Sequence, residues 1–418
     1  MFTTPRGTQD ILPADWAYWD YVVGHAADVA QLFGYRRIET PTFESTSLFA
    51  RTSGEGTDVV DKEMYTLQDR NGDDLTLRPE DTAPIMRAYM QHGMSRLPQP
   101  VKLWYVEANF RYSAPQKGRL REHHQFGAEV IGVDDAYADV ELIALLHTLY
   151  GRLGLTGLTL HLNSIGDPSC RPEYVRTLVT YLRAHEDRLS PTDRERVERN
   201  PLRVLDSKEA PAGLLENAPV ITDYLCDACR AHFEKVQRGL RLLGIDYSLT
   251  PYLVRGLDYY TRTVFEFTPP SERAQATVGG GGRYDGLSEA LGGPPIPGVG
   301  FGTGIERLIL NIQEQGIEVP PLPSPATFVA HAGAGSEEAA LRIVMALRRA
   351  GIGAEMTFGT RSLKAQMRHA GNAGAGTAII AGEDELQQGE VTLRSMQTHQ
   401  QSTIPLDDVV DEVRRLIE

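Results

Sequence analysis

The segment VKLWYVEANFRYSAPQKGRLREHHQFGAEVIGV, residues 101–133, decides the fold class of this chain. Its two ends, 101–113 and 125–133, are rich in β-branched and aromatic residues, so each predicts a strand. The polar stretch between them, residues 114–124, is interpreted as a loop. Strands joined in this way pair as antiparallel neighbours, whereas parallel strands need a longer crossover, usually a helix. The segment therefore predicts an α+β domain built on an antiparallel sheet rather than a doubly wound parallel sheet.

Helices and further strands are predicted around this hairpin. Apolar residues recur at helical spacing from Trp19 to Phe33, and Gly34 follows as a stop signal. The other predicted elements are, in chain order, a strand over 35–44 interrupted by Pro41, a hairpin over 63–80 that turns at NGDD, a short helix over 83–93, a helix over 139–151 and a strand over 261–267.

Two changes in composition divide the rest of the chain. Residues 168–248 have mainly helical patterns and predict a helical insertion. The stretch EVPPLPSPA, residues 318–326, has four prolines in nine positions and predicts a stiff, extended linker. Beyond the linker, a β-α-β-α-β pattern predicts a small α/β domain. We therefore predict a core over residues 1–325 that contains the insertion, and a second domain over residues 326–418.

Composition limits the classes of function. The net charge of −14 argues against blanket binding to nucleic-acid backbones, so a nucleic-acid partner would have to meet local basic patches. No apolar run approaches the roughly 20 residues that span a bilayer, and we expect no membrane association. The N-terminal residues MFTTPRGTQDILP have no hydrophobic signal core, which predicts a cytoplasmic protein.

The cysteines offer a weak metal-binding signal. Cys226 and Cys229 form one C-x-x-C pair, whereas a structural zinc site needs about four ligands. Cys170 and His232 could complete a set, but their spacing is irregular. We therefore interpret the pair as semi-buried thiols on a helix and predict no metal site made of protein side chains.

Three arginines are hard to explain as core residues. Arg111 lies within the predicted strand 101–113, where a charge costs desolvation free energy unless it meets an anion. Arg255 opens RGLDYY, just before the strand at 261–267, and Arg307 follows the alternating glycines of GVGFGTG, residues 298–304. We predict that the three guanidinium groups surround a triphosphate. The chain has no Gly-x-x-x-x-Gly-Lys-Ser/Thr loop, and no ribose-binding acid follows the glycines in a βαβ unit, which excludes P-loop and dinucleotide sites.

Glycines and acids accompany these arginines. The alternating glycines would leave one strand face bare for a planar ligand, and the four glycines at 279–282 would let the backbone approach a ligand or turn sharply. Asp81 or Thr82 would cap the helix that follows, but capping does not explain Glu80, whose carboxylate could hold an ammonium group. Gln125 and Glu129 are an even number of residues apart, so their side chains share one face of a strand.

Seven motifs in this order resemble the class II aminoacyl-tRNA synthetases, and among them the histidyl-tRNA synthetase family. They are RGTQDILP (6–13), LRPEDTA (77–83), FRYSAPQKGR (110–119), HQFGAE (124–129), VRGLDYY (254–260), GGRYDGL (281–287) and GVGFGTGIER (298–307). The resemblance covers nearly the whole chain, and RGLDYY is its most specific part. It implies ATP- and Mg²⁺-dependent ligation of L-histidine to tRNA(His) through a histidyl-adenylate. It also implies a homodimer and an anticodon-binding domain at residues 326–418.

The same resemblance implies roles for individual residues. Arg255 would contact the carboxylate of histidine and the α-phosphate as a catalytic clamp, and Arg111 would hold the α-phosphate. The expected histidine-binding residues are Glu80, Asp81, Thr82, Arg111, Gln125, Glu129, Arg255, Tyr259 and Tyr260. The expected ATP-binding residues are Arg111, Ser113, His123 and Arg307, the last at the γ-phosphate. The expected acceptor-stem contacts are Gln116, Lys117 and Arg119.

The sequence departs from the family at three positions, and it leaves two other functions to weigh. Ser113 and Ala114 stand where the family commonly has glutamate and arginine, and His123 stands where an aromatic residue usually stacks on adenine. One alternative is a catalytically silent, synthetase-like regulatory subunit that senses histidine. Such paralogues typically lack the C-terminal domain and active-site residues that this chain retains. A synthetase for glycine or proline is the other alternative, and RGLDYY argues against it.

Overall fold

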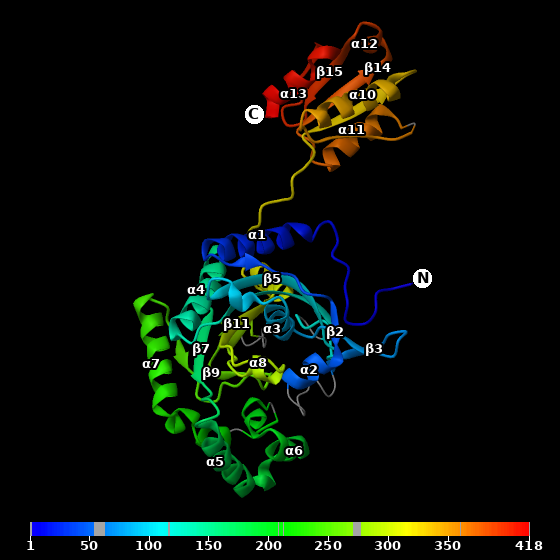
Figure 1. Cartoon of the computed structure of the whole chain (residues 1–418). Coiled ribbons are helices and arrows are strands. Elements are labelled where there is room, and N and C mark those ends of the chain that lie inside the picture. Colours follow the sequence, from blue (N-terminus) through cyan, green and yellow to red (C-terminus); the bar gives the residue numbers. More distant parts are fainter. Residues whose placement is uncertain are drawn as a thin grey trace. The chain divides into compact units, whose positions relative to one another are not determined.

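The computed structural model describes residues 2–53, 63–115, 118–207, 209–211, 213–270, 277–359 and 361–417. The chain forms two compact units, Met1–Pro320 and Pro321–Glu418 (Figure 1). Each unit has its own sheets and its own hydrophobic core.

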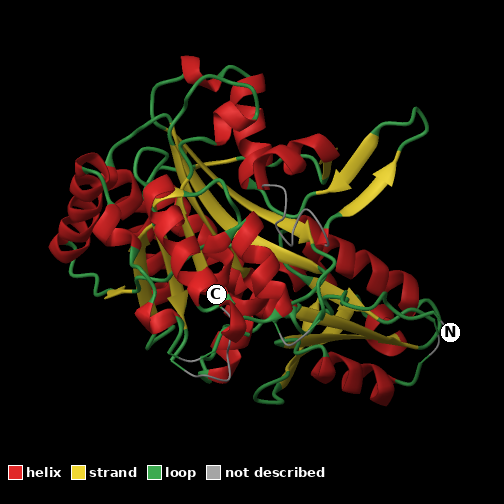
Figure 2. Ribbon diagram, turned by 90° about the horizontal axis from the view of Figure 1, so that it is seen from below, coloured by secondary structure: helices red, strands yellow, loops and turns green. Residues whose placement is uncertain are grey.

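An eight-stranded sheet is the centre of the first unit (Figure 2). Its strand order is β1-β5-β6-β11-β10-β9-β7-β8. The strands are β1 (Arg36–Arg37), β5 (Val101–Phe110), β6 (Glu122–Ile131), β7 (Thr159–Ser164), β8 (Ser248–Leu249), β9 (Thr261–Thr268), β10 (Gly279–Arg283) and β11 (Gly298–Gly304). All pairs from β5 to β7 are antiparallel, and only the short edge strands β1 and β8 pair in parallel. The predicted antiparallel α+β class is confirmed.

The end of β5 and the start of β6, which face the connecting loop, both differ from the prediction. Strand β5 ends at Phe110, so Arg111 lies just beyond the strand and not within it. Strand β6 begins at Glu122, so His123 and His124, predicted as loop residues, pair with Asn109 and Ala108. Strand pairing therefore continues through polar residues for which the composition predicted a loop.

Three helices cover one face of this sheet: α1 (Trp16–Leu32), α4 (Ala136–Arg152) and α9 (Ile305–Glu314). Their apolar residues join the strands in one core, in which Phe126 of β6 packs on Phe301 of β11 with ring centroids 5.6 Å apart. Side chains alternate along a strand, so Gln125 and Glu129 point to the opposite face. That second face carries the candidate site.

A three-stranded sheet of order β2-β4-β3 lies beside the main sheet. Its strands are β2 (Phe43–Ser45), β3 (Tyr65–Gln68) and β4 (Asp74–Leu77), and the predicted hairpin of β3 and β4 is confirmed. The short helices α2 (Thr46–Ser53), α3 (Thr82–Gln91), η2 (Met94–Arg96) and α8 (Leu287–Ala290) complete this part of the unit.

The region predicted as a helical insertion is mainly helical in the structure. Its elements are α5 (Arg171–Ala184), η3 (Glu186–Arg188), α6 (Pro191–Arg199), η4 (Pro201–Asp206), η5 (Leu215–Asn217), η6 (Ile221–Tyr224) and α7 (Asp227–Leu242). Helix α7 packs against α4, and the fully buried pair of Asp139 and Arg283 ties α4 to β10. The insertion is thereby anchored next to the central sheet.

The second unit has a five-stranded sheet of order β13-β12-β14-β15-β16. Its elements are β12 (Thr327–Ala332), α10 (Ser336–Arg349), β13 (Ala354–Met356), α11 (Leu363–Asn372), β14 (Thr377–Gly382), α12 (Glu383–Gln387), β15 (Glu390–Ser395), β16 (Gln401–Pro405), η7 (Leu406–Asp408) and α13 (Val409–Ile417). Strand β12 pairs in parallel with β13 and β14, which confirms the predicted β-α-β-α-β order. The antiparallel strands β15 and β16 were not predicted.

Among the helices that the structure describes, none is long and apolar enough to cross a bilayer.

Candidate active site

A cavity of about 430 Å³ lies on the open face of the main sheet and brings together the three arginines singled out in the sequence. Arg111, Arg255 and Arg307 all line it, although they come from three distant parts of the chain. The other predicted site residues that line it are Ser113, Arg119, His123, Gln125 and Tyr260. Its floor contains Gly279 and Gly280 of β10 and Gly302 and Gly304 of β11.

Backbone carbonyl groups and one carboxylate orient the guanidinium groups. The Nε of Arg111 donates to the carbonyl of Pro79 at 2.8 Å. Arg307 donates from Nε to the carbonyl of Gly118 at 3.0 Å and from Nη1 to that of Thr277 at 2.6 Å. Arg255 pairs with the carboxylate of Glu266. A guanidinium has five N–H donors, so each arginine retains donors for an anion in the cavity.

Several positive charges lie close to one another in the cavity. Burial lowers the pKa of Arg307, and the nearby charges of Arg119 and Arg111 lower it further. Burial and then the charge of Arg111 lower the pKa of His123 to about 3, so its imidazole is neutral at physiological pH. Neighbouring positive charges destabilise one another and lower one another's pKa. An anion bound among them stabilises their charged forms. A polyphosphate meets this requirement.

The glycines of β10 and β11 make room for side chains of the site. A Cβ at Gly300 would lie 1.6 Å from Oε2 of Glu129, and one at Gly302 would lie 3.1 Å from Oε1 of Gln125. On β10, a Cβ at Gly280 would lie 2.9 Å from Nη1 of Arg255. The predicted bare strand face exists, but the protein's own polar side chains fill much of it.

A buried cluster of acids and hydroxyl groups, called the pocket below, lies next to the cavity. Glu129 is fully buried and accepts hydrogen bonds from the hydroxyl groups of Tyr284 (2.5 Å), Thr82 (3.0 Å) and Tyr105 (3.5 Å). Burial is the largest influence on this carboxyl group and raises its pKa to about 8. In the free pocket at neutral pH, Glu129 is therefore mostly protonated.

Glu80 has the capping role that was predicted for its neighbours. Its carboxylate accepts from the backbone N–H groups of Thr82 at 2.8 Å and Ala83 at 3.1 Å, at the start of α3. Asp81 occupies the N-cap position but makes no side-chain cap bond. It accepts instead from Asn109 at 2.7 Å and lies 3.5 Å from Arg78. The side chain that caps α3 therefore belongs to the residue before the N-cap position.

The RGLDYY segment connects the cavity to the buried pocket. The ring of Tyr260 lies 5.9 Å from the guanidinium carbon of Arg255 and 4.8 Å from the ring of Tyr259. Tyr259 in turn donates to Glu80 at 3.3 Å, and its ring lies 5.9 Å from that of Tyr284. One short segment therefore places a cation at the anion cavity and two phenols at the acidic pocket.

The structure adds two residues that the sequence analysis did not place in the site. Tyr105 and Tyr284 both donate to Glu129, and Tyr284 belongs to GGRYDGL, a quoted motif to which no role was assigned. The motif was the available signal for Tyr284. Of the predicted acceptor-stem contacts, Gln116 and Lys117 lie outside the described residues, whereas Arg119 pairs with Glu63 at 2.9 Å.

Two family models and several curated proteins match this chain. The family model described as histidyl-tRNA synthetase matches residues 7–308, and the model described as anticodon binding domain matches residues 326–416. A curated relative named histidine--tRNA ligase, from Dehalococcoides mccartyi strain 195, is 51% identical over 418 residues and is covered completely, as is this chain. A relative with the same name from Moorella thermoacetica is 48% identical, with 100% of this chain and 99% of the relative covered.

Solved structures give the same result. The apo histidyl-tRNA synthetase of S. aureus has a TM-score of 0.83 and 37% sequence identity, with 99% of this chain and 100% of that chain covered. The fold is therefore that of class II synthetases, with a catalytic core and a C-terminal anticodon-binding domain. By these matches, which span both units, the chain belongs to the family of histidyl-tRNA synthetases, enzymes that join histidine to tRNA.

Proposed function

We propose that this chain ligates L-histidine to tRNA(His) in two steps, through a histidyl-adenylate made from histidine and ATP. One observation supports the proposal. An arginine-lined cavity lies beside a buried cluster of carboxyl and hydroxyl groups, and the segment of Arg255, Tyr259 and Tyr260 contributes to both. A triphosphate fits the cavity, and an amino acid with a polar, hydrogen-bonding side chain fits the pocket.

In the first step, the carboxylate of histidine attacks the α-phosphorus of ATP and pyrophosphate leaves. The substrate supplies its own nucleophile, so the site needs no general base. Arg111 and Arg255 hold the α-phosphate and the attacking carboxylate, and Arg307 holds the γ-phosphate. Because carbonyl groups and Glu266 fix these guanidinium groups in advance, they stabilise the developing charge with little reorganisation.

The pocket provides the recognition of histidine. A neutral imidazole has one N–H donor and one bare nitrogen that accepts. Glu129 accepts from the N–H group, and Tyr260 donates its phenolic proton to the other nitrogen. Glu80 and Thr82 receive the α-ammonium group, Tyr259 lines the pocket, and Gln125 orients the amino acid. Asp81 supports the pocket through its hydrogen bond with Asn109.

ATP and Mg²⁺ fit the remaining residues of the cavity. Ser113 and His123 line it and are assigned to the adenine end of ATP. The carboxylates of Glu266 and Glu306 also line it, and oxygen ligands of this kind suit Mg²⁺ held mainly by phosphate oxygens. When bound, the ion would neutralise phosphate charge and orient the pyrophosphate group.

In the second step, a ribose hydroxyl at the 3′ end of tRNA(His) attacks the acyl carbon of the adenylate. The ester forms as the hydroxyl loses its proton, the acyl–phosphate bond breaks, and AMP leaves. Arg119, at the rim of the cavity, together with Gln116 and Lys117, is assigned to the acceptor stem. The second unit is assigned to the anticodon. The enzyme acts in the cytoplasm as a homodimer, as the family implies.

A silent regulatory subunit is the alternative. A Bacillus halodurans structure described as an ATP phosphoribosyltransferase regulatory subunit/histidyl-tRNA synthetase has a TM-score of 0.64 at 24% identity. This likeness shows the fold alone and does not favour that alternative.

The test is histidine-dependent exchange of pyrophosphate into ATP, followed by charging of tRNA(His). Wild type should exchange with histidine and not with glycine or proline. Arg255→Ala should lower the exchange rate by about 10²–10³-fold, the scale for removing one preorganised donor. Arg183→Ala is the matched control, because it removes an exposed arginine that pairs with Glu198 in the insertion. Near-wild-type exchange by folded Arg255→Ala would contradict the catalytic role.

A further inference from the structure

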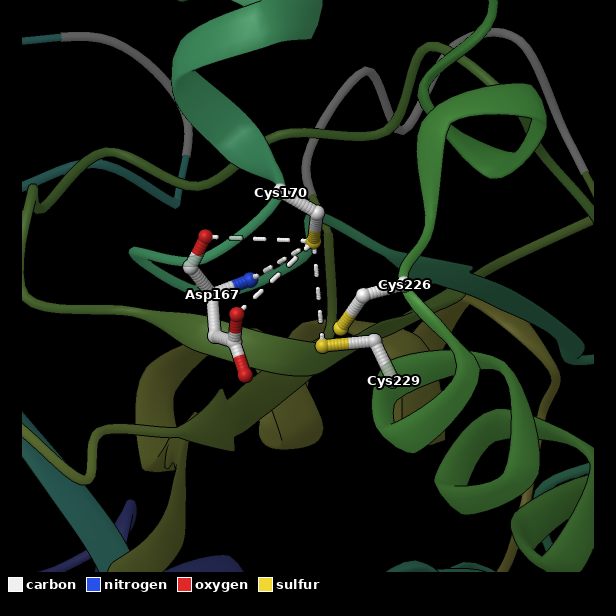
Figure 3. Close-up of side chains that lie close together, drawn as sticks. All are labelled: Asp167, Cys170, Cys226 and Cys229. Atoms are coloured by element: carbon white, nitrogen blue, oxygen red, sulfur yellow. Dashed lines mark hydrogen bonds between the residues drawn. The ribbon is translucent and has the colours of Figure 1, made fainter.

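Three cysteines and one aspartate meet at the junction between the insertion and the central sheet. Asp167 and Cys170 lie in the turn between β7 and α5, whereas Cys226 and Cys229 lie at the start of α7. The four potential ligand atoms lie within 4.8 Å of one another (Figure 3). Cys170 and Cys229 are buried, so the cluster is closed to bulk water on at least one side.

The separations match those of a tetrahedral metal site. Sγ of Cys170 lies 3.8 Å from Sγ of Cys229 and 3.8 Å from Oδ1 of Asp167. Two sulfur ligands about 2.3 Å from a Zn²⁺ ion are about 3.8 Å apart in a tetrahedron. We propose that Asp167, Cys170, Cys226 and Cys229 bind one Zn²⁺ ion as a closed structural site.

The local backbone is built to gather these sulfur atoms. Cys170 is the N-cap of α5 and Cys226 the N-cap of α7, and neither makes a side-chain cap bond. Two helix N-termini therefore meet at the cluster, and their partial positive charge would stabilise the negative charge of metal-bound sulfur ligands. Gly166 has φ +62°, and a Cβ there would lie 2.8 Å from Sγ of Cys170. The turn requires glycine both for its conformation and for the space that the sulfur occupies.

The carboxylate of Asp167 is oriented for the same role. Its Oδ2 atom lies 3.5 Å from Nη2 of Arg262, which leaves Oδ1 facing the sulfur of Cys170. His232, the ligand that the sequence suggested beside Cys170, is engaged elsewhere, since its Nε2 lies 3.3 Å from Asp139. The oxygen ligand therefore comes from a residue that no cysteine spacing indicated.

A metal at this position would connect the insertion to the histidine pocket. Arg171, next to Cys170, donates to the carbonyl of Gly166 at 3.0 Å and to that of Tyr260 at 2.7 Å. The backbone N–H of Arg262 also donates to the carbonyl of Gly166, at 2.7 Å. The turn that holds two ligands therefore contacts the backbone of the pocket segment directly. We infer a positioning role for the ion and no part in the chemical steps.

The experiment is metal analysis of the full-length chain purified in reducing buffer, first as isolated and then after Zn²⁺ is added and the excess removed. We expect about one zinc per chain. Replacement of the zinc by Co²⁺ should give the thiolate charge-transfer and tetrahedral d–d absorption bands of a sulfur-rich site. Chelation should lower the midpoint of thermal unfolding by about 5 °C or more, and Zn²⁺ should restore it.

Variants separate the site from general instability. Cys229→Ser should lose the zinc, and Asp167→Asn should weaken zinc binding. Asp187→Asn, an exposed acid in the same insertion, should leave it unchanged. If the serine variant does not fold, Asp167→Cys tests the same geometry, since a fourth thiolate should keep the zinc and slow its extraction by a chelator. A wild-type chain without zinc whose unfolding midpoint a chelator does not shift would overturn the proposal. A Cys170–Cys229 disulfide in place of the metal would also overturn it.

Discussion

At the scale of single residues, Glu129 combines two properties that do not agree at neutral pH. Its proposed role is to accept from the N–H group of imidazole, which requires the ionised carboxylate. In the free pocket, burial raises its pKa to about 8, so at pH 7 most molecules hold a proton there. Productive binding of histidine must therefore include loss of this proton.

This conflict predicts a pH dependence. The ratio kcat/KM for histidine reports groups of the free enzyme, so it should rise as Glu129 ionises. Between pH 7 and 8.5 the ionised fraction of a group with pKa about 8 grows about eightfold, and kcat/KM in the exchange assay should grow by about as much. The KM for ATP should change little over the same range.

Glu129→Gln is the informative variant, because it keeps the shape of the side chain and removes the titration. Its kcat/KM for histidine should be low and flat with pH, while Arg183→Ala should follow the wild-type profile. A wild-type profile that falls as the pH rises through 8 would mean that the protonated carboxyl group is the active form and donates to the imidazole.

At the scale of elements, the glycines of β11 determine whether the pocket can exist. Gly300→Ala would place a Cβ 1.6 Å from Glu129, which is too close for any adjustment of a carboxylate in a packed core. Gly302→Ala would place one 3.1 Å from the end of the Gln125 side chain, which can move by a few tenths of an ångström. Gly24→Ala in α1 meets nothing within 4 Å.

The expected order of damage follows these distances. Gly300→Ala should lower histidine-dependent exchange by about 10²-fold or more, the scale for a misplaced positioning group, and Gly302→Ala should lower it less. Gly24→Ala should retain full exchange and gain about 0.5–1 kcal/mol of stability, because alanine is the better helix former. Exchange rates and thermal unfolding of the three variants check this. If Gly300→Ala and Gly24→Ala had equal exchange rates, the glycines of β11 would not be needed to make room for the pocket.

At the scale of the whole molecule, the two units have separate hydrophobic cores. Ile317 and Val319 pack at the margin of the first core and are its last members along the sequence. The second has one cluster around Val329 and Ile379 and another around Phe328 on the other side of its sheet. A chain that ends after Pro320 therefore keeps every core residue of the first unit.

We expect this shortened chain to fold and to make histidyl-adenylate at a rate close to that of the full chain. It should charge tRNA(His) poorly, because contacts near the anticodon would be lost. Exchange and aminoacylation measured on the same preparation separate the two outcomes. Equal aminoacylation by both chains would show that residues 321–418 do not serve tRNA binding, and loss of exchange would show that the units are not independent.

Much of the fold could be predicted because its signals are local. The helix that begins near Trp16, the hairpin that turns at Gly72 and the β-α-β-α-β order of the second unit follow from periodicity and turn residues over short windows. The three arginines could be predicted as one group because each is a costly charge beside glycines or strand ends. A charge in such a place requires an anion.

The sequence by itself therefore determined the fold class, many of the main elements and the grouping of the three arginines. Only the tertiary structure decided which atoms meet. Glu80 caps α3 because the chain turns within its reach, and Tyr284 reaches Glu129 because β10 and β6 flank β11 with a fixed register. Cys170 and Cys229 come together because α5 and α7 begin at the same point in space. Such contacts depend on strand register and helix packing between distant segments, and periodicity along one segment carries no information about either.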